Sequence, residues 1–551
     1  MKYNENFNIV KKSVRNGDYE HASEILEQLK VQSPHETELL NKIGMYYISM
    51  GQYKKALVNL QESFENEKSV ETLELLAVVN ENCENNEDAA IQYETLLEYK
   101  NDEQIYDKCS DMYLKQGYDE EAIRITKKCV ENKSTISSYA RLVYLYILTG
   151  MDKEAKSCFK EMESKFPNHS ITYNTAGLLN ECVDNDYETA KKYYEKSAKM
   201  GFIDAYYNLG VCCKQTEDLE SAEKYLKKLI SLKANSAMDY NYTLGLIYMA
   251  ERKLRLGHKY YKNRLSTQNL RAYYKKHLWD GKDYPDGTLY VATEQGYDDN
   301  IQFVRYVPKL LNKFKKVYLE TKEPLLELFK LSYPESKYKN LELVLPETVV
   351  NFSHFTLITD IPNLLNETFH NIPSKKSYLK CSKEKTEKFK NELFDNKELK
   401  IGLNWKSNGM GLRDTIYRTI DAPYYFRNIM KISGIKYYSF QKNDIFEMCQ
   451  KYPEIKDITP ELKTYNDYAA ALKNLDIFVT VDTELAHLAG ALGVKTYLLL
   501  CYAPDWRWFD NTVKTEWYPS ITIIKQSDRK NWEDVSSKLE KYIVKNNKSL
   551  R

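Results

Sequence analysis

Small residues recur along the first half of the chain at a nearly constant interval, and this recurrence restricts the possible folds strongly. The interval is 32 to 35 residues, and the residues are Ala22, Ala56, Ala90, Ala122, Ala155, Ala190, Ala222 and Gly257. A turn-like segment with Gly or Asn precedes most of them, as in NGDYEHA and MGQYKKA. A second small residue stands earlier in several units, as in NKIGMYY and YYNLGVCC. Small residues at two sites let paired helices touch, so the pattern predicts stacked helical hairpins.

These units resemble the tetratricopeptide repeat, including Pro34 and Pro167 at unit ends. The pattern covers roughly residues 3–268 in about eight units, and we expect an all-α repeat array over residues 1–268. Such arrays usually hold another polypeptide on their concave surface. The alternative is an array that only mediates self-association, which would make the protein a homo-oligomer.

Two features of the array resemble metal sites and are better explained by structure. The DND sequence at 184–186 falls in the turn before Ala190, where Asp and Asn favour the backbone geometry of turns. Four His residues of the array share no spacing, so they predict no metal site; they are His21, His35, His169 and His258.

The composition excludes some classes of partner. The chain has 80 Lys and Arg residues against 79 Asp and Glu residues. Its formal charge of +1 gives no electrostatic reason to bind nucleic acid or anionic membranes. Ten Cys residues occur without a CxxC pair, which favours reduced, buried thiols. The first residues lack an apolar signal core and no run of 18 apolar residues occurs, so we expect a cytoplasmic protein without membrane insertion.

The second half alternates short apolar runs with helical patterns. Four predicted strands come first, in TLYVATE, KVYLETK, LELVLP and FTLIT. Six follow, in LKIGLNW, IKYYSFQ, IKDIT, DIFVTVD, KTYLLLC and ITIIKQ. Strands separated by helices imply parallel sheets, here two Rossmann-like halves over residues 269–395, which include a linker helix, and 396–551. We expect the hinge in the charged segment 380–397, and ligands beyond the carboxyl ends of the strands.

The segment VDTELAHLAGALGV places a turn and a helix directly after the strand DIFVTV. The first N–H groups of a helix lack intrahelical partners and carry the positive end of its dipole, so a phosphate fits there. Asp482 and Thr483 precede the helix, and His487 lies on the same face as Thr483, within reach of that phosphate. A His that only packs in a core helix is the alternative.

The same segment continues as VKTYLLLCYAPDWRWF and then EWYPSITIIKQ, and it closely resembles bacterial tetratricopeptide-repeat glycosyltransferases. Those proteins are related to the heptosyltransferase-like family and, more loosely, to protein O-GlcNAc transferases. The resemblance extends through YNDYAAALKNLDIFVTVD, YYSFQKND, IGLNWKSN, HLWDGK and EQGYDDNIQFVRYVP, and so covers nearly all of residues 277–545. It implies a GT-B fold, an α and α/β chain overall, with the nucleotide-sugar donor bound mainly by the second half.

The resemblance also implies a general base. The related sequences read Glu-Gln-Gly-x-Gly-Asp, which Glu294, Gln295, Gly296 and Asp299 match here, while Asp298 replaces the second Gly. Asp299 is therefore the candidate catalytic base for an acceptor hydroxyl. Asp298 either raises the pKa of its neighbour or distorts a turn that needs positive φ. Asp299 as a simple helix cap is the alternative.

Donor phosphates are expected at the loop KSNGMGLRDTIYRT. Its cations are Lys406, Arg413 and Arg418, of which Arg418 is the best match to the family. The chain keeps Asn408 and Asp414 of the family pattern but departs from it at Gly411 and Thr419. The expected donor-binding residues are Gln295, Gly296, Trp405, Lys406, Arg418, Gln441, Lys442, Asp482, Thr483 and His487. No metal or other cofactor is expected, because a helix N-terminus and Arg418 are available for the phosphates.

Three functions compete. The leading hypothesis is a metal-independent, inverting glycosyltransferase that modifies a protein held by the repeats. The resemblance suggests flagellin or another surface protein as acceptor, and a nonulosonic acid or hexosamine as sugar. The second is a transferase for a glycan or lipid-linked acceptor, and the third is a scaffold with a degenerate transferase domain. In APDWRWF, residues 503–509, one Trp is expected to pack and the other to line the sugar or base.

Overall fold

The protein is described from a computed structural model. It describes residues 3–232, 240–264, 272–294, 296–346, 348–374, 377–394, 397–407, 417–420, 422–442, 445–508 and 513–550. The chain forms two compact units. The first comprises Met1–Ala205 and Arg271–Tyr273, and the second comprises Tyr206–Leu270 and Tyr274–Arg551.

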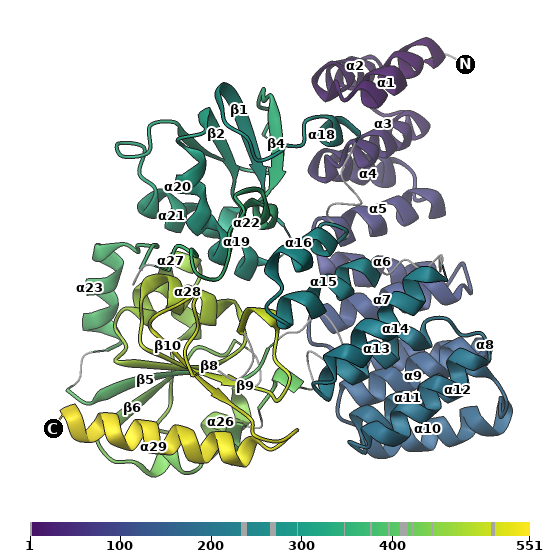
Figure 1. Ribbon diagram of the computed structural model, residues 1–551. Helices are drawn as coiled ribbons and strands as arrows, with labels where there is room; N and C mark the ends of the chain where they lie inside the picture. Colours follow the sequence, from purple (N-terminus) through teal and green to yellow (C-terminus); the bar gives the residue numbers. More distant parts are fainter. Residues whose placement is uncertain are drawn as a thin grey trace. The chain divides into compact units, whose positions relative to one another are not determined.

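The first unit is a series of antiparallel helical hairpins, shown in Figure 1 from purple to blue. Its helices are α1 (Asn4–Asn16), α2 (Tyr19–Gln32), α3 (Thr37–Met50), α4 (Tyr53–Asn66), α5 (Val70–Asn82), α6 (Asn86–Leu96), α7 (Glu103–Lys115), α8 (Asp119–Lys133), α9 (Ile136–Leu148), α10 (Asp152–Lys165), α11 (Ser170–Cys182) and α12 (Tyr187–Lys199). The recurring alanines lie near the start of the second helix of each hairpin and are buried. The predicted helical hairpins are therefore confirmed.

Turns and close helix contacts follow the small residues. Gly17 and Gly51 end α1 and α3 in the left-handed conformation, which only Gly adopts at no cost. A Cβ at Gly177 would collide with the ring of Tyr194 on the following helix. The DND segment is a turn as expected, since Asp186 accepts the N–H of Thr189 and caps α12.

The second unit begins with two more hairpins, α13 (Ala205–Gln215) with α14 (Leu219–Ser231), and α15 (Tyr240–Ala250) with α16 (Leu254–Tyr261). The last pair is packed backbone against backbone. A Cβ at Gly245 would lie 2.6 Å from the backbone nitrogen of Tyr261 and 2.9 Å from the carbonyl oxygen of Gly257. Side chains of this pair, Met249, Leu254 and Tyr261, share one hydrophobic core with the sheets that follow.

The first sheet follows a short helix, α18 (Ala272–Lys276). Its strands are β1 (Tyr284–Ala292), β2 (Phe314–Glu320), β3 (Leu341–Val344) and β4 (His354–Leu357), all parallel and ordered β3-β2-β1-β4. The connecting helices are α19 (Tyr297–Phe303), η1 (Val304–Tyr306), α20 (Val307–Leu310), α21 (Glu323–Ser332), η2 (Ile358–Asp360) and α22 (Ile361–Leu364). The charged segment expected to form the hinge contains α23 (Lys383–Glu392), which packs against α27 (Tyr465–Leu472).

The second sheet has six parallel strands in the order β10-β9-β8-β5-β6-β7. They are β5 (Leu399–Asn404), β6 (Ile435–Ser439), β7 (Lys456–Asp457), β8 (Ile477–Val481), β9 (Thr496–Leu500) and β10 (Ile521–Lys525). The remaining helices are α25 (Ala422–Tyr425), η3 (Ile429–Lys431), α26 (Phe446–Lys451), η4 (Thr459–Glu461), α28 (Glu484–Leu492), η5 (Trp506–Trp508) and α29 (Trp532–Leu550). All ten predicted strands are present, and this order is that of the doubly wound Rossmann sheet.

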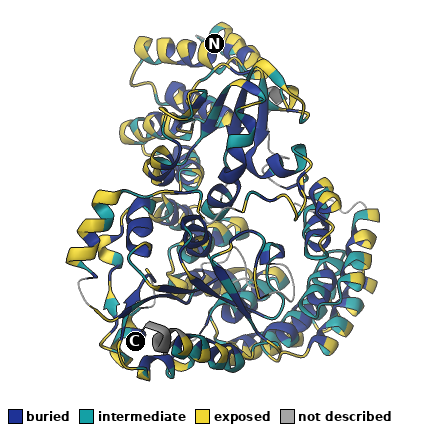
Figure 2. Cartoon of the chain, turned by 60° about the vertical axis from the view of Figure 1, so that its left-hand side comes forward, coloured by how far each residue is buried: buried dark blue, intermediate teal, exposed yellow. Residues whose placement is uncertain are grey.

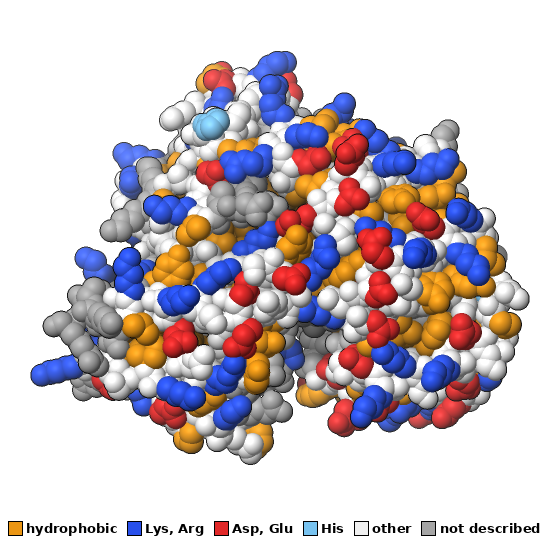
Figure 3. Space-filling model, turned by 60° about the horizontal axis from the view of Figure 1, so that its bottom comes forward, with side chains coloured by type: hydrophobic (Ala, Val, Ile, Leu, Met, Phe, Trp, Pro, Cys, Tyr) orange, Lys and Arg blue, Asp and Glu red, His pale blue; other side chains and the backbone are white. Residues whose placement is uncertain are grey.

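Burial follows the layers. The central strands are buried, whereas helices expose one face, as the blue strands and yellow helix faces of Figure 2 show. All ten cysteines are free and most are buried, as the composition predicted. On the face drawn in Figure 3, positive and negative side chains are interspersed. Among the described helices, none is both long and apolar enough to cross a membrane.

Candidate functional site

The candidate site lies where the order of each sheet reverses. In the first sheet the chain runs from β1 out to β3 and then returns to β4 on the other side of β1. In the second sheet the corresponding reversal separates β5 from β8. Side chains beyond the carboxyl ends of such strands face the crevice where ligands of this fold class bind.

Asp299 lies in the first turn of α19, directly after the loop that leaves β1. The N-cap of the helix is Gly296, which is extended with φ −75° and ψ 133°, and Asp298 does not have positive φ. The distorted turn considered for Asp298 is therefore absent. The carboxylate of Asp298 approaches Gly296 so closely that a Cβ there would collide with it.

The carboxylate of Asp299 pairs with a guanidinium from the other half of the unit. Oδ1 of Asp299 lies 2.5 Å from Nη2 of Arg507, so Asp299 is not a simple helix cap. Burial raises the pKa of Asp299 to about 7, and the negative charges of Asp298 and Glu294 add to the rise while Arg507 opposes it. The group therefore changes its charge near neutral pH.

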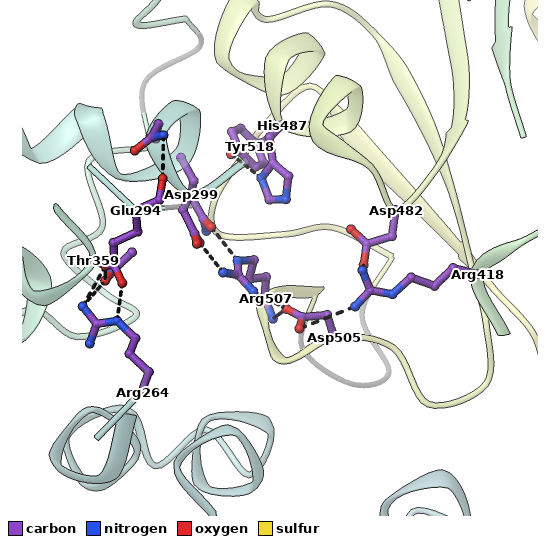
Figure 4. Close-up of polar contacts among 12 residues, drawn as sticks. Arg264, Glu294, Asp299, Thr359, Arg418, Asp482, His487, Asp505, Arg507 and Tyr518 are labelled. Atoms are coloured by element: carbon purple, nitrogen blue, oxygen red, sulfur yellow. Dashed lines mark hydrogen bonds and ion pairs between the residues drawn. The ribbon is translucent and has the colours of Figure 1, made fainter. Parts of the chain in front are cut away.

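Arg507 belongs to a chain of alternating charges, drawn in Figure 4. Besides Asp299, it donates from Nε to Gln302 Oε1 at 2.9 Å and from Nη1 to Asp505 Oδ1 at 2.9 Å. Asp505 Oδ2 lies 3.8 Å from Nη2 of Arg418, whose Nη1 lies 3.3 Å from Asp482 Oδ2. The ion pairs thus connect the first turn of α19 to Asp482, directly after β8.

Burial shapes the protonation of this chain. It raises the pKa of Asp482 to about 6, against the opposing charge of Arg418. Burial would also raise the pKa of Asp505, but the guanidinium groups of Arg507 and Arg418 hold it below its ordinary value. A small pocket lies beside these groups, and it is lined by Arg418, Asp482, Leu499, Leu500, Cys501 and Pro504.

The helix predicted to bind phosphate is α28, and it packs against α19. Its cap, Thr483, makes no side-chain capping bond, and its Oγ1 accepts from Asn404 Nδ2 at 3.0 Å. The first N–H groups of α28 are therefore not capped by that side chain, although the acidic Glu484 lies in the same turn.

His487 lies in the interior, 1% exposed. Its Nδ1 lies 2.8 Å from the hydroxyl of Tyr518, and its ring packs 4.9 Å from that of Trp508. Burial lowers the pKa of His487 to about 3, so the imidazole is neutral at physiological pH. It can act on a ligand as a neutral hydrogen-bonding group and not as a cation.

The residues after β5 and β6 are held together by one amide. Gln441 Oε1 accepts the backbone N–H groups of Trp405 at 3.2 Å and Lys406 at 2.9 Å. Lys442 extends its ammonium over the ring of Tyr468 at 5.7 Å. Trp405 and Gln441 are buried, whereas Lys442 is exposed.

Several residues singled out in the sequence lie outside the described residues: Gln295, Asn408, Gly411, Arg413 and Asp414. Both tryptophans of APDWRWF are described. Trp506 and Trp508 are 2% and 0% exposed, which corrects the expectation that one of them lines a ligand. Among the described residues, no group of three or more His, Cys, Asp and Glu side chains is arranged to hold a metal ion.

Sequence reasoning missed three charged members of the site, Arg264, Asp505 and Arg507. Arg507 stands between the two tryptophans that drew attention, and Asp505 is two residues before it. Asp299, the partner of Arg507, lies 208 residues before it in the sequence. An Arg inside an otherwise buried aromatic segment was the available signal, because a buried charge needs a partner.

Comparison with known proteins agrees with the helical part of the chain. The model of the tetratricopeptide repeat matches residues 37–69 and 203–236. The chain carries tetratricopeptide repeats. Among curated proteins, protein FlbA of Caulobacter vibrioides is 21% identical over 419 residues, which cover 69% of this chain and 68% of FlbA. Since the repeat helices end at Tyr261, that similarity extends into the region of the sheets.

Two solved structures are similar to part of the chain. A tetratricopeptide repeat protein from Parabacteroides merdae has 20% identity and a TM-score of 0.33, covering 46% of this chain and 98% of that chain. Yeast Tom70 has 15% identity and a TM-score of 0.33, covering 46% of this chain and 57% of its own.

Proposed function

We propose that the protein is a glycosyltransferase of the GT-B type that moves a sugar from a nucleotide-sugar to an acceptor hydroxyl. The observation that supports this most is the pair of Asp299 and Arg507. It joins the carboxyl edge of one Rossmann-ordered sheet to the loop after β9 of another. A carboxylate that has a pKa near 7 and lies between two such edges is suited to act as a general base.

The proposed reaction is a single displacement. Asp299 takes the proton of the acceptor hydroxyl, whose oxygen forms a bond to the anomeric carbon of the donor. The bond from that carbon to the phosphate oxygen breaks, and the nucleotide leaves with the electron pair. The N-terminus of α28 and Arg418 stabilise the negative charge on the leaving group, which removes the need for a metal ion.

The acceptor is proposed to be a protein held by the repeats. Arrays of this kind offer a large concave surface for another polypeptide. A flagellin or another surface protein fits the resemblance of the sheet region to repeat-bearing transferases. Transfer to a glycan or a lipid-linked acceptor, with the repeats docking other partners, is the competing outcome.

The test combines an assay with a matched variant. Purified protein is incubated with a panel of nucleotide-sugars and host proteins, and mass spectrometry detects the added sugar. We expect a sugar adduct on one protein, and Asp299→Asn to lower transfer by about 10²- to 10⁴-fold, the range for a lost general base. Asp298→Asn tests the neighbouring carboxylate and should retain transfer, because Asp299 is still present. Adducts only on glycans or lipids would refute the protein acceptor, and no transfer from any donor would favour a non-catalytic scaffold.

A further inference from the structure

We propose that Arg264, at the end of the last repeat hairpin, is a positioning residue of the candidate active site, so that this hairpin is part of the site. The role assigned to Arg264 rests on the proposed function of Asp299. The inference concerns how the catalytic turn is held, and it makes the end of the repeat array more than a docking surface.

Arg264 is fully engaged at the carboxyl edge of the first sheet. Its Nε and Nη2 bind the two carboxylate oxygens of Glu294 at 2.5 and 2.7 Å, a bidentate pair. Nη1 binds Asp360 Oδ1 at 2.8 Å, and Nη2 binds Thr359 Oγ1 at 2.6 Å. The side chains of Arg264 and Glu294 are each only 6% exposed.

These partners surround the reversal point of the sheet. Glu294 lies two residues after β1, while Thr359 and Asp360 follow β4, the strand that pairs with β1 on its other side. The hydroxyl of Thr359 also donates to Glu294. One guanidinium therefore ties the ends of β1 and β4 together, as Figure 4 shows.

Glu294, which Arg264 binds, lies on the loop that leads to the candidate base. The loop from Glu294 enters α19 at Gly296, and Asp299 lies in the first turn of that helix. The side chain of Asn300 reaches back to the carbonyl of Glu294 at 3.4 Å. Because Glu294 stands between Arg264 and the start of α19, fixing its carboxylate fixes where that helix begins.

The last hairpin also reaches the other sheet. The ring of Tyr261 lies 6.4 Å from that of Trp506, next to Arg507, and the guanidinium of Arg264 lies 4.8 Å from the centre of the Tyr261 ring. Arg252 of the turn before α16 pairs with Glu516 at 2.6 Å. The hairpin therefore contacts Trp506, the neighbour of Arg507, while Arg264 at its end holds Glu294, five residues before Asp299.

A buried ion pair is weak evidence for stability by itself, since its desolvation cost can exceed its attraction. Its effect on position and on the local field is testable. Among the described residues, the charged and titratable groups that interact with Asp299 include Asp298, Glu294, Arg507, Tyr261 and Tyr242. Arg264 neutralises Glu294, the member of this set that lies on the loop leading into α19.

The experiment uses the full-length chain in four forms: wild type, Arg264→Gln, Glu294→Gln and the double variant. Arg255→Gln, at an exposed position of α16, is the control. The titration of Asp299 is followed in the carboxyl infrared band by subtracting the spectrum of each form carrying Asp299→Asn. Thermal melting establishes that each form is folded.

We expect the pKa of Asp299 to rise in Arg264→Gln, fall in Glu294→Gln and return toward the wild-type value in the double variant. The control should match wild type. In the transfer assay, kcat should fall by about 10- to 100-fold in Arg264→Gln, the scale of a displaced catalytic group, with KM for the donor unchanged. The double variant should recover part of that loss.

The outcomes separate the two proposals. An Asp299 titration that is the same in wild type and Arg264→Gln would overturn the positioning role, whether or not the wild type transfers sugar. If the titration shifts as expected while no form transfers sugar, the positioning role stands and the proposed function fails. If Arg264→Gln does not fold, Arg264→Lys, which keeps the charge and loses the bidentate geometry, must still lower kcat while leaving KM for the donor unchanged.

Discussion

At the scale of single residues, the ionisation of Asp299 depends on a partner from another strand end. Arg507 opposes the rise in the pKa of Asp299, which burial places at about 7. The proposed base is active when ionised, so transfer should increase with pH through about 7. Removing the guanidinium in Arg507→Gln should raise the pKa of Asp299 and move the acidic limb of the kcat/KM profile to higher pH.

The measurement is a pH profile of transfer for Arg507→Gln beside Arg427→Gln. Arg427 pairs with Glu533 at 2.6 Å on α29, remote from the ion chain, and serves as the control. The profile of Arg427→Gln should overlie that of wild type. An unshifted limb in Arg507→Gln would show that Asp299 is not the group that titrates in the rate.

His487 makes a second prediction at this scale. Burial lowers its pKa to about 3, so its interaction with a donor phosphate is that of a neutral imidazole. Protonation of His487 should therefore contribute no transition to donor affinity near pH 6.5, where an exposed His would titrate. His487→Ala should weaken donor binding by about 1.5–3 kcal/mol, the range for hydrogen bonds to charged groups.

Isothermal titration calorimetry with the cognate nucleotide-sugar measures both effects. Tyr518→Phe is informative beside it, because the hydroxyl of Tyr518 lies 2.8 Å from Nδ1 of His487. That variant keeps the imidazole and should weaken binding less than His487→Ala. Equal affinity of His487→Ala and wild type would restrict His487 to packing against Trp508 and Tyr518.

At the scale of elements, close packing of α15 on α16 places Arg264. A Cβ at Gly245 would meet the backbone of α16, whereas a Cβ at Gly44 of α3 would meet the side chain of Leu60. Backbone atoms cannot rotate out of the way, so Gly245→Ala should cost about 1–3 kcal/mol of stability, as overpacking does. Gly44→Ala should cost less, because the side chain of Leu60 can move aside, whereas the gain in helix propensity of about 1 kcal/mol applies to both variants.

Chemical denaturation of both variants tests the difference, and donor binding and transfer are measured on the folded protein. We expect Gly245→Ala to impair transfer as well, since a displaced α16 carries Arg264 with it. Gly44→Ala lies in the first unit and should retain transfer of a sugar to a small acceptor. A Gly245→Ala protein as stable and active as wild type would mean that α15 and α16 can separate without disturbing the site.

The elements were predictable because their signals are local. The recurring small residues predicted the hairpins, and the apolar runs predicted all ten strands, including the two-residue β7. The candidate positions Asp482 and Thr483 followed from a strand end, and Asp299 followed from the family resemblance. The partners of Asp299 and Glu294 were not predictable, because Arg507 is 208 residues from the first and Arg264 is 30 residues from the second. Ion pairs between distant segments produce no periodic pattern in the sequence.

Local patterns also misjudged burial. The aromatic pair Trp506 and Trp508 resembled a ligand wall, but both rings pack in the core. His487, for which the sequence left phosphate contact and core packing both open, is 1% exposed and in contact with Tyr518. Side-chain exposure depends on what the rest of the chain places over a helix, and periodicity describes only the helix itself.

At the scale of the whole molecule, the division of the chain into two units separates the repeats into two groups. The hairpins α1 to α12 belong to the first unit, and α13 to α16 belong with the sheets. Polar contacts join these later hairpins to the second sheet, since Glu217 pairs with Lys525 at 2.7 Å and the carbonyl of Gln215 accepts from Arg529. The position at which the repeats are truncated should therefore determine whether the protein loses only acceptor recognition or also donor binding and folding.

Deleting residues 1–204 should abolish transfer to a protein acceptor while sparing donor binding, because the ion chain and α28 lie in the second unit. Deleting residues 1–264 should remove far more. It takes away Arg264, leaves Glu294 as a buried charge without this partner, and exposes the part of the hydrophobic core that Met249, Leu254 and Tyr261 cover. Loss of a partner from a buried pair alone costs about 3–5 kcal/mol.

Calorimetry with the donor and thermal melting distinguish the two deletions. The shorter deletion should bind the donor with wild-type affinity and melt cooperatively, and the longer one should neither bind nor melt as a folded domain. If the longer deletion binds donor normally, the last hairpins are dispensable for the site. If the shorter deletion still modifies the protein acceptor, the acceptor is recognised by the second unit, and α1 to α12 serve another partner.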